Sequence, residues 1–454
     1  MTLRVLPGGR DQGGPGLLVR GAAEVVTMTG GLRRGASQDD PAAITADASS
    51  GGPTGPRAPA VAAWGGRIVA VGPLDEVTAR LSAEGLDAER FAVVDARGGM
   101  VTPGLIDPHT HLLFAGTREG ELRLRQRGAG YLEILAAGGG ILSTVTRTRA
   151  ASAEQLHAHG RRWLDEMLGH GVTTIEAKSG YGLDVETELR LLEVLGVLGD
   201  EGPVEIVPTF LGAHAVPAEY RDRPDGTEAY VRRVIGEQLP AIELQGIARF
   251  CDVFCERGVF SAEQSRRILE AGIRHGLAPR LHADELAPSG GAELAAELGA
   301  VSADHLAAPS REGMAALVRA AGSPHPVVAT LLPATSLYLM KERDAPGRTL
   351  IDRGVPVALG TDFNPGTSPT PNLPLVLSLA CLRLKLTPAE ALAAVTINAA
   401  HAVGLGETHG ALEPGRVADL VVWDASSHEV LPYWLGADLA RVVVKGGAVV
   451  LARG

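Results

Sequence analysis

Two histidines separated by a single residue, His109 and His111, end the stretch "GLIDPHTH". Alternate residues of an extended chain point to the same side, about 6–7 Å apart, so both imidazoles can reach one ion. Three further side chains that can bind a metal follow apolar runs later in the chain: His282, His305 and Asp362. Neutral imidazoles combined with a carboxylate suit zinc or iron and leave room for water. These residues together predict a metal centre.

Each of these residues has a simpler explanation when it is considered alone. A single histidine is more often structural than ligating, and an aspartate such as that of "GTD" is common in turns. Their shared position at the ends of strand-like runs favours a metal site, because the rim of one barrel would bring them together. Such a site lowers the pKa of bound water from above 15 towards about 7, which gives hydroxide at neutral pH.

The elements that must position these side chains alternate regularly between residues 101 and 404. Eight apolar runs, each followed by a helix-like stretch, end near "GLIDPHTH", "VTTIEAKSGYG", "EIVPTFLGAH", "ARFCDVFCE", "APRLHADE", "AVSADH", "HPVVATLLP" and "PVALGTDFN". Almost continuously apolar runs are typical of buried parallel strands. "SAEQ" (261–264) and "TPAE" (387–390) fit capping boxes at helix starts. The pattern predicts an α/β protein with a (β/α)8 TIM-type barrel over residues 101–404; a three-layer sandwich with the same alternation is the alternative.

Both ends of the chain have a different pattern, with short apolar runs separated by glycine-containing turns. This pattern favours antiparallel strands. We expect residues 1–100 and 405–454 to form one small β-domain together. Residues 30–60 are rich in Gly, Ala, Pro, Ser and Asp and have few large apolar side chains, which predicts a flexible surface loop.

The composition limits the partners and the cellular location. The net charge of −11 argues against non-specific nucleic-acid binding, which needs a basic surface. Cys251, Cys255 and Cys381 cannot form a disulfide framework, so we expect reduced thiols. We find neither a signal-peptide pattern nor an apolar stretch of about 18 residues, so we expect a cytoplasmic protein with no membrane partner.

Several of these motifs are similar to those of the amidohydrolase superfamily. The resemblance rests on "VTPGLIDPHTH", the later strand-end histidine pair, "GTD" and "LEPGRVADLVVWD", and it covers nearly the whole chain apart from residues 30–60. The superfamily consists of metal-dependent hydrolases whose barrel is joined to a small β-sandwich built from both termini. The resemblance therefore implies a β-sandwich for the terminal domain and a hydrolytic activity for the barrel.

A closer resemblance is to the family of hydrolases that open an imidazolone ring in histidine degradation. It rests on "HTHLLFAGTR", "EAKSGYGL", "FLGAHAVP", "LHADEL", "ADH" and "LGTDFNPGT". It implies one zinc or iron ion with four ligands: His109, His111, His282 and Asp362. It also implies contacts with the substrate or product from seven residues: Arg118, Tyr181, His214, Glu285, Asn364, Gly366 and Thr367. A homodimer is usual in the family.

The substrate that this resemblance implies, 4-imidazolone-5-propanoate, has a carboxylate tail and a cyclic amide. Arg118 offers a fork-shaped cation for the tail, and Tyr181 can add a hydroxyl. Without the motif, Arg118 would be interpreted as a solvated surface charge and Tyr181 as a packing residue in a glycine-flanked loop.

The catalytic hypothesis assigns proton transfer to three residues. His305 or Asp362 helps to remove the proton of the attacking water, and the sequence does not choose between them. Glu285, three residues after His282, carries a proton to the departing ring nitrogen, so that the ring opens to N-formimidoyl-L-glutamate. His214 would bind the ring carbonyl or its developing oxyanion. The simpler explanation of Glu285 is an acid favoured near a helix N-terminus.

The position of lysine residues in the barrel bears on the number of metal ions to expect. Many binuclear relatives in the superfamily place a carboxylated lysine after the fourth barrel strand, where this chain has "FCERG". Lys178 follows the second strand, so we expect a single metal and interpret Lys178 as a loop charge or a partner of a metal ligand.

Two alternative functions remain open. The first is another cyclic amidase or a deaminase of the superfamily, which would share the metal ligands; Arg118, Tyr181 and the "NPGT" loop favour a substrate with an acidic tail instead. The second is a non-catalytic interaction protein on the same scaffold, because a fold by itself does not establish an activity.

Overall fold

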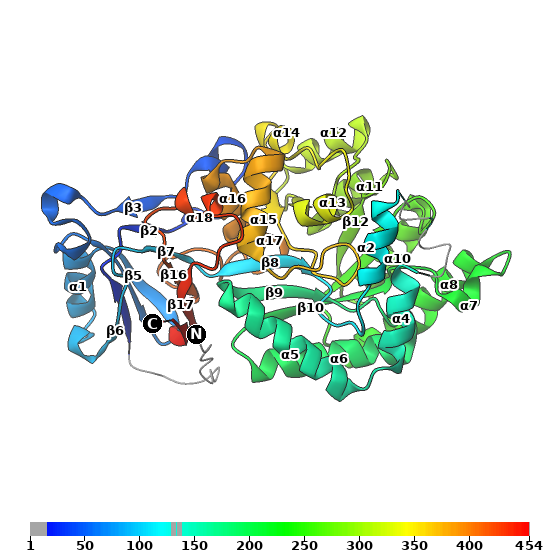
Figure 1. Cartoon of the computed structure of the whole chain (residues 1–454), viewed down its shortest axis with the longest axis horizontal. Helices are drawn as coiled ribbons and strands as arrows, with labels where there is room; N and C mark the ends of the chain where they lie inside the picture. Colours follow the sequence, from blue (N-terminus) through cyan, green and yellow to red (C-terminus); the bar gives the residue numbers. More distant parts are fainter. Residues whose placement is uncertain (1–15, 129–132, 134–138, 454) are drawn as a thin grey trace.

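The computed structural model describes residues 16–453 except 129–132 and 134–138. These residues form a barrel of parallel strands with a smaller unit of two β-sheets beside it, on the left of Figure 1. Among the described residues, no helix is both long enough and apolar enough to cross a membrane.

The barrel contains the eight predicted runs in chain order, and each neighbouring pair of strands is parallel. A parallel bridge between Thr110 and Phe363 joins the last strand segment to the first and closes the sheet. Closure confirms the TIM-type barrel and excludes the three-layer sandwich. The strands are β8 (Leu105–Thr110), β9 (Val172–Lys178), β10 (Glu205–Ala213), β11 (Phe250–Cys255), β12 (Ala278–Ala283), β13 (Ser302–His305), β14 (Val328–Leu331) and β15 (Val357–Leu359).

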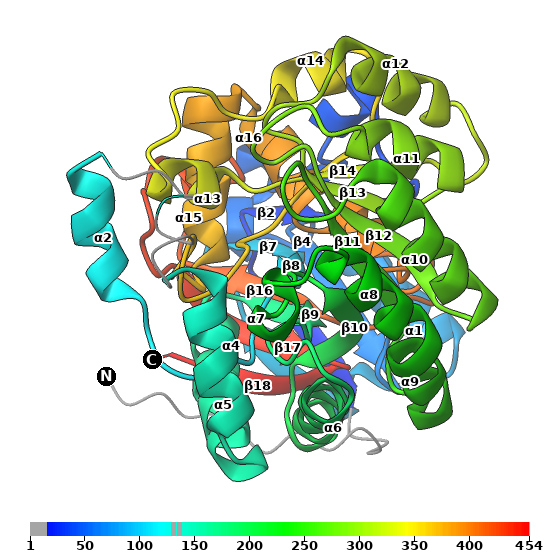
Figure 2. The same ribbon diagram turned by 90° about the vertical axis from the view of Figure 1, so that its right-hand side faces the viewer.

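Helices surround the barrel strands (Figure 2). The longer ones are α4 (Ile141–Ala150), α5 (Ala153–Gly169), α6 (Val185–Glu201), α8 (Gly226–Arg233), α9 (Leu239–Gln245), α10 (Ala262–Arg274), α11 (Gly291–Leu298), α12 (Arg311–Ala320), α15 (Leu373–Leu379) and α16 (Pro388–Ala394). Shorter helices are α7 (Ala218–Arg221), α13 (Pro333–Tyr338), α14 (Gly347–Asp352) and α17 (Ile397–Ala402), and two π-helical turns cover 234–238 and 380–384. α2 (Glu119–Gln126) follows β8 near the barrel mouth.

Local sequence signals explain where several helices begin. Ser261 caps α10 and Thr387 caps α16, each in a capping box, as predicted. Asp184 caps α6 by accepting a hydrogen bond from the backbone N–H of Thr187. These caps satisfy backbone donors that the first helical turn leaves without partners.

The smaller unit draws strands from both ends of the chain, as expected (Figure 1). A four-stranded sheet has the order β5-β4-β1-β6, and a six-stranded sheet has the order β18-β17-β16-β7-β2-β3. Their bounds are β1 (Leu17–Arg20), β2 (Glu24–Val26), β3 (Ala43–Thr45), β4 (Pro59–Trp64), β5 (Arg67–Pro73), β6 (Ala92–Asp95), β7 (Met100–Pro103), β16 (Leu420–Trp423), β17 (Ala440–Lys445) and β18 (Ala448–Ala452). Helix α1 (Leu74–Ala83) packs on β4 and β5 of this unit, whereas α18 (Val430–Tyr433) packs on α15 of the barrel. An apolar cluster that includes Val19, Val61, Val25 and Leu420 takes side chains from both sheets, which makes the unit a β-sandwich.

Two details differ from the sequence expectations for this unit. β1 pairs with β6 in parallel, and β2 pairs with β7 in parallel, whereas the apolar runs favoured antiparallel strands throughout. Parallel pairs need long connections, which residues 21–91 provide between β1 and β6 and residues 27–99 between β2 and β7. β7 ends at Pro103, three residues beyond the expected domain boundary; the division into 1–100 with 405–454 and 101–404 itself stays a prediction.

The segment 30–60 is largely exposed or half-buried, as its composition predicts for a surface segment, but parts of it form regular structure and pack on the barrel. β3 pairs with β2, and Gln38 is fully buried against the barrel. The Gln38 side chain donates to the carbonyls of Val357 and Glu390 and accepts from the amide of Val357. Polar hydrogen bonds rather than large apolar side chains hold this segment in place, which is why a count of apolar residues misses it.

Candidate metal centre and active site

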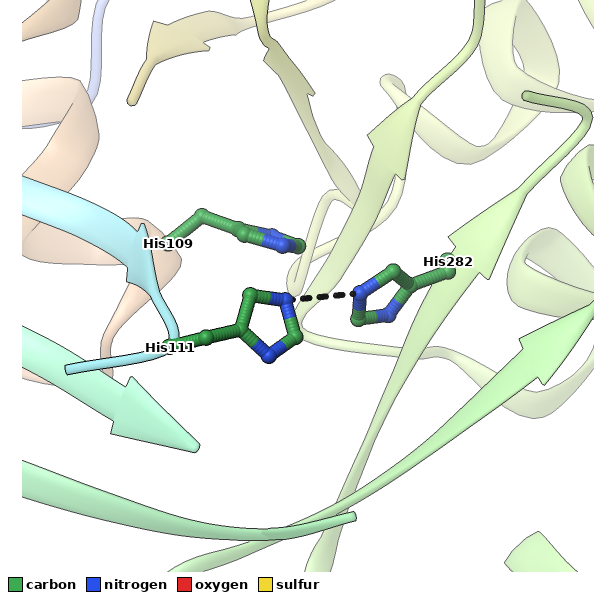
Figure 3. A group of neighbouring side chains, drawn as sticks. All are labelled: His109, His111 and His282. Carbon is green, nitrogen blue, oxygen red and sulfur yellow. Dashed lines mark hydrogen bonds between the residues drawn. The ribbon is translucent and has the colours of Figure 1, made fainter. Parts of the chain in front are cut away.

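The predicted metal-binding side chains converge at the C-terminal ends of the barrel strands. His109 and His111 lie at the end of β8, His282 lies near the end of β12, and His305 is the last residue of β13. Figure 3 shows the rings of His109, His111 and His282 turned toward one another. Ligand atoms of these three, and likewise those of His109, His305 and Asp362, lie within 4.8 Å of one another.

Two buried carboxylates orient the histidines. Nδ1 of His109 lies 2.6 Å from Oδ2 of Asp304, and Nδ1 of His282 lies 3.1 Å from Oδ1 of Asp252. A carboxylate on Nδ1 fixes the ring and leaves Nε2 as the nitrogen available to a metal, as is usual for metal-binding histidines. Nε2 of His282 lies 3.4 Å from Nε2 of His111, so the two rings face each other through these nitrogens.

Asp362 completes this cluster. Its Oδ1 lies 3.4 Å from Nε2 of His111 and 3.6 Å from Nε2 of His109, while the hydroxyl of Thr335 donates to its Oδ2 at 2.7 Å. The backbone of Asp362 has a φ of 52°, and that of His305 has a φ of 72°. Non-glycine residues rarely adopt this left-handed conformation, and where they do, it often marks a functional site.

The donor set fits a divalent cation. Nε2 of His109 is buried and has no hydrogen-bond partner among the described residues. Burial and the nearby cation Lys178 hold the pKa of His109 well below its usual value, and burial also lowers the pKa of His111, so both imidazoles are neutral donors. Burial raises the pKa of Asp362 to about 7. A bound cation would reverse that shift, because it stabilises the ionised carboxylate. Imidazoles with one carboxylate are the ligands that zinc and iron(II) commonly take.

Lys178 is neither a loop charge nor placed to bridge two metals. It is fully buried, and its Nζ lies 2.8 Å from both Oε1 of Glu176 and Oδ2 of Asp252. Burial lowers the pKa of Lys178, but Asp252 and Glu176 outweigh that effect and raise it overall. A carboxylated lysine would be an anion and would be repelled by these carboxylates, so the contacts suit only the ammonium form.

The predicted substrate residues line one cavity beside this cluster. The lining includes every predicted site residue except His109 and Gly366, together with Ile141 and Phe254. His214, just beyond β10, stacks on the ring of His111 with a centroid distance of 4.8 Å, and its Nδ1 lies 3.0 Å from the carbonyl oxygen of Gly180. Tyr181 is 2% exposed, and its ring lies 5.3 Å from that of His214. A larger cavity of about 380 Å³ shares Ile141, His214 and Phe254 with this one.

Arg118 is held at this cavity in a fixed orientation. Its Nε and Nη2 donate to the two carboxylate oxygens of Glu121, each at 3.0 Å. Gly366 packs closely against the same guanidinium: a Cβ on Gly366 would lie 2.1 Å from Cζ of Arg118. A two-point ion pair combined with a glycine contact holds the plane of the guanidinium, which presents it as a shaped donor for an anion.

Asn364 and Thr367 build the loop that presents Gly366. The Asn364 side chain donates to the carbonyl of Asp362 at 2.7 Å and accepts from the amides of Gly366 and Thr367 at 2.8 and 2.7 Å. These bonds close the "NPGT" turn directly after Asp362. The turn therefore connects Asp362 of the metal cluster to Gly366, which packs against Arg118.

Glu285 lies where it can exchange protons with a bound molecule. Its Oε2 is 3.7 Å from Nε2 of His305, and its Oε1 is 3.6 Å from Nζ of Lys341. Lys341 also donates to the carbonyl of Glu285 at 2.9 Å. The neighbouring Asp284, with a φ of 51°, accepts hydrogen bonds from the amides of Ser289 and Ala292 at the start of α11. Asp284 rather than Glu285 therefore accepts hydrogen bonds from the backbone N–H groups at the N-terminus of α11.

The sequence interpretation missed the residues beneath the cluster. Asp252, Asp304, Arg280 and Thr335 contact the ligand side chains or each other and are fully or almost fully buried. Asp252 and Asp304 each lie inside a fully buried strand, and a charge within a strand-like run of the sequence was the available signal. Asp304 is in the "ADH" motif, directly before His305.

The cysteines lie outside the cluster. Cys251 and Cys255 are buried, Cys381 is partly buried, and no disulfide joins them in the described part of the chain. Burial raises the pKa of all three thiols, so they are protonated at neutral pH and carry no nucleophile for this site.

Comparison with known proteins first defines a class. Models of the amidohydrolase family match residues 92–180 and 263–449. Solved structures with the same fold include an adenosine deaminase from Xanthomonas campestris with bound zinc (TM-score 0.66, 19% identity, covering 96% of this chain and 93% of that one). Guanine deaminase from E. coli is similar to the same extent (TM-score 0.67, 15% identity, covering 97% and 99%).

Curated relatives are much closer in sequence. An imidazolonepropionase from Geobacillus thermodenitrificans is 54% identical over 389 residues, which cover 86% of this chain and 89% of the relative. One from Symbiobacterium thermophilum is 48% identical over 439 residues, which cover 96% and 98%. The chain therefore belongs to the imidazolonepropionase family of amidohydrolases.

Proposed function

We propose that this protein hydrolyses the cyclic amide of 4-imidazolone-5-propanoate to N-formimidoyl-L-glutamate, in the degradation of L-histidine. The observation that carries the proposal is one cavity in which Arg118 and the histidine cluster share a lining. The cluster suits hydrolysis of an amide, and a cation held by Glu121 and Gly366 suits a propanoate tail. The close relatives named imidazolonepropionase support the same activity.

Four residues would hold the metal: His109, His111, His282 and Asp362. A bound zinc or iron ion supplies a Lewis acid that makes a water nucleophilic near neutral pH. Their donor types do not select one of the two metals, because both accept imidazole and carboxylate.

The remaining residues bind the substrate and move protons. Arg118 binds the carboxylate tail with Tyr181 beside it, and His214 binds the ring carbonyl or its developing oxyanion. Because Nδ1 of His214 already donates to the carbonyl of Gly180, donation to the substrate from Nε2 requires the protonated ring, which the developing negative charge favours. His305 or Asp362 accepts the proton of the attacking water. Glu285 delivers a proton to the departing ring nitrogen, and its 3.7 Å separation from His305 leaves room for exchange between them.

A substrate panel tests the proposal. The purified protein, loaded with Zn²⁺ or Fe²⁺, should turn over imidazolone propanoate and leave guanine and cytosine unchanged. Glu285→Gln and His305→Ala should each lower kcat by about 10²–10⁴-fold, as expected for the loss of a proton-transfer group. His159→Gln changes a histidine outside this cavity and is the control, which should stay close to the wild-type rate. Turnover of a neutral base without turnover of imidazolone propanoate would contradict the proposal.

The family resemblance extends the proposal to the assembly and location of the protein. We expect a homodimer in the cytoplasm, which sedimentation and cell fractionation can check.

A further inference from the structure

Lys178 is a buried cation that the proposed reaction does not use. Its side chain is 0% exposed, although lysine is almost never fully buried without partners. Nζ lies 2.8 Å from Glu176 on its own strand β9, 2.8 Å from Asp252 on β11 and 3.8 Å from Asp304 on β13. These contacts place the ammonium inside the barrel, below the histidine cluster.

Asp252 connects this ammonium to the cluster. One of its oxygens, Oδ1, accepts from the backbone N–H of His282 and contacts Nδ1 of the same ring, both at 3.1 Å. The other oxygen, Oδ2, lies 2.8 Å from Nζ of Lys178 and 3.1 Å from Nδ1 of His282. The carboxylate thus lies between the ammonium and the imidazole and contacts both.

We propose that Lys178 is a positioning residue for the metal centre, which fixes the carboxylate of Asp252 and through it the ring of His282. His282 has no other hydrogen bond to Nδ1 among the described contacts, so Asp252 alone sets the direction of its Nε2. Asp304 differs, because Arg280 also donates to it at 2.9 Å and holds it against His109. The inference rests on the metal-binding part of the proposed function.

Charge balance explains why a cation is needed at this position. Glu176, Asp252 and Asp304 are all fully buried within the barrel. Arg280 neutralises Asp304 directly but lies no closer than 4.0 Å to Glu176. Lys178 is therefore the cation in contact with Asp252 among the described residues, and a buried carboxylate without a cation is strongly destabilised.

Metal affinity is the measurement that tests the inference. We would load the wild type and Lys178→Met with Zn²⁺ and measure affinity by competition with a chromophoric chelator. The loss of a carboxylate that orients a metal-binding histidine typically lowers affinity by about 10–100-fold, and we expect a fall in this range. The visible absorption spectrum of the Co²⁺-loaded variant should also change, because the geometry at His282 changes.

A second lysine with two carboxylate partners, half-buried Lys445, provides a control. Lys445 on β17 lies 3.0 Å from Glu205 and 2.7 Å from Asp419, away from the cluster. Lys445→Met should lower stability because it also removes a lysine that contacts two carboxylates. Its Zn²⁺ affinity should stay within twofold of the wild-type value, and its Co²⁺ spectrum should be unchanged. A fall in affinity of equal size in Lys445→Met would assign the effect to general destabilisation and overturn the inference.

A double-mutant cycle tests the route through Asp252. If Lys178 acts through that carboxylate, adding Lys178→Met to Asp252→Asn should lower Zn²⁺ affinity by less than threefold further. A larger additional loss overturns the inference, and this comparison also carries the test if Lys178→Met alone does not fold. Unchanged affinity in Lys178→Met overturns this inference only, whereas a wild type that binds no Zn²⁺ overturns the proposed function as well.

Discussion

At the scale of single residues, Gly366 has a role that depends on its lack of a side chain. The guanidinium of Arg118 occupies the space that a Cβ would need, 2.1 Å from Cζ. Gly366 does not have a positive φ, so the reason for glycine here is close approach and not backbone conformation. This close contact between the guanidinium and the "NPGT" turn makes the position of Arg118 sensitive to one added methyl group.

Gly366→Ala should therefore displace Arg118 and weaken binding of the substrate carboxylate. We expect KM for imidazolone propanoate to rise by about tenfold or more, which corresponds to about 1.4 kcal/mol of binding free energy. Gly120→Ala on α2 is the matched control, because nothing lies within 4 Å of a Cβ there. Steady-state kinetics of both variants check this, and equal KM values in wild type and Gly366→Ala would contradict it.

The sequence was informative about residues that act together at strand ends and uninformative about residues beneath them. His109, His111, His282, His305 and Asp362 were predictable as a group because the alternation of strands and helices brings strand ends together. The role of Lys178 was not, because a single sequence does not distinguish a lysine that ends a strand at the surface from one that points into the barrel. Only the contacts with Asp252 and Glu176 decide between them.

At the scale of elements, a partly buried polar cluster joins the start of β10 to the sandwich. Glu205, the first residue of β10, contacts Lys445 on β17 at 3.0 Å and His409 at 3.1 Å. Burial raises the pKa of Glu205, but the hydrogen bond from His409 and the charge of Lys445 outweigh burial and hold it well below its usual range. This carboxylate therefore couples the stability of the two units to pH.

The sign of that coupling follows from the direction of the shift. The folded-state pKa of Glu205 is lower than the value of about 4.3 for an unfolded chain, so its contribution is present above about pH 5. It is lost as the pH falls through the folded-state pKa. Glu205→Gln should lower the free energy of unfolding by about 1–3 kcal/mol at pH 7, and the difference from wild type should shrink in acid.

Urea unfolding at several pH values checks this expectation. Glu186→Gln serves as the control, because the Glu186 side chain is 90% exposed and its removal should change stability by less than about 0.5 kcal/mol. A difference between wild type and Glu205→Gln that stays constant down to pH 3 would mean that the carboxylate does not lose its partners in acid.

Element prediction succeeded where the pattern was regular and failed where strands pair across long connections. Eight alternating units and the capping boxes at Ser261 and Thr387 were all visible in the sequence. The parallel pairs β1–β6 and β2–β7 were not, because strand direction in a short apolar run leaves no mark in its composition.

At the scale of the whole molecule, the metal centre joins the ends of strands that are far apart in the sequence. Its proposed ligands come from β8, β12 and the segment after β15, so a bound ion ties the first, fifth and eighth strands of the barrel together. An ion that binds only this folded arrangement stabilises the fold by mass action.

Removal of the metal should therefore lower both activity and thermal stability. At a free metal concentration of about 100 Kd, binding adds about 2.7 kcal/mol to the free energy of unfolding, so chelation should lower Tm and added Zn²⁺ should restore it. Asp362→Asn should respond far less to either treatment. Scanning calorimetry with and without chelator measures this, and a Tm that ignores both chelator and Zn²⁺ would contradict the proposed ligand set.

The buried amide of Gln38 has a consequence for any attempt to divide this protein. This side-chain amide accepts a hydrogen bond from the N–H of Val357 on β15 and donates one to its carbonyl, as a peptide group of a neighbouring strand would. Gln38 itself belongs to the segment between strands of the sandwich. A shortened chain that begins at the first barrel strand would remove the acceptor of the Val357 N–H and leave the side chain of Asn398 as a donor to the Val357 carbonyl, on the strand that leads to Asp362. We therefore expect the barrel to be less stable when it is produced without the smaller unit.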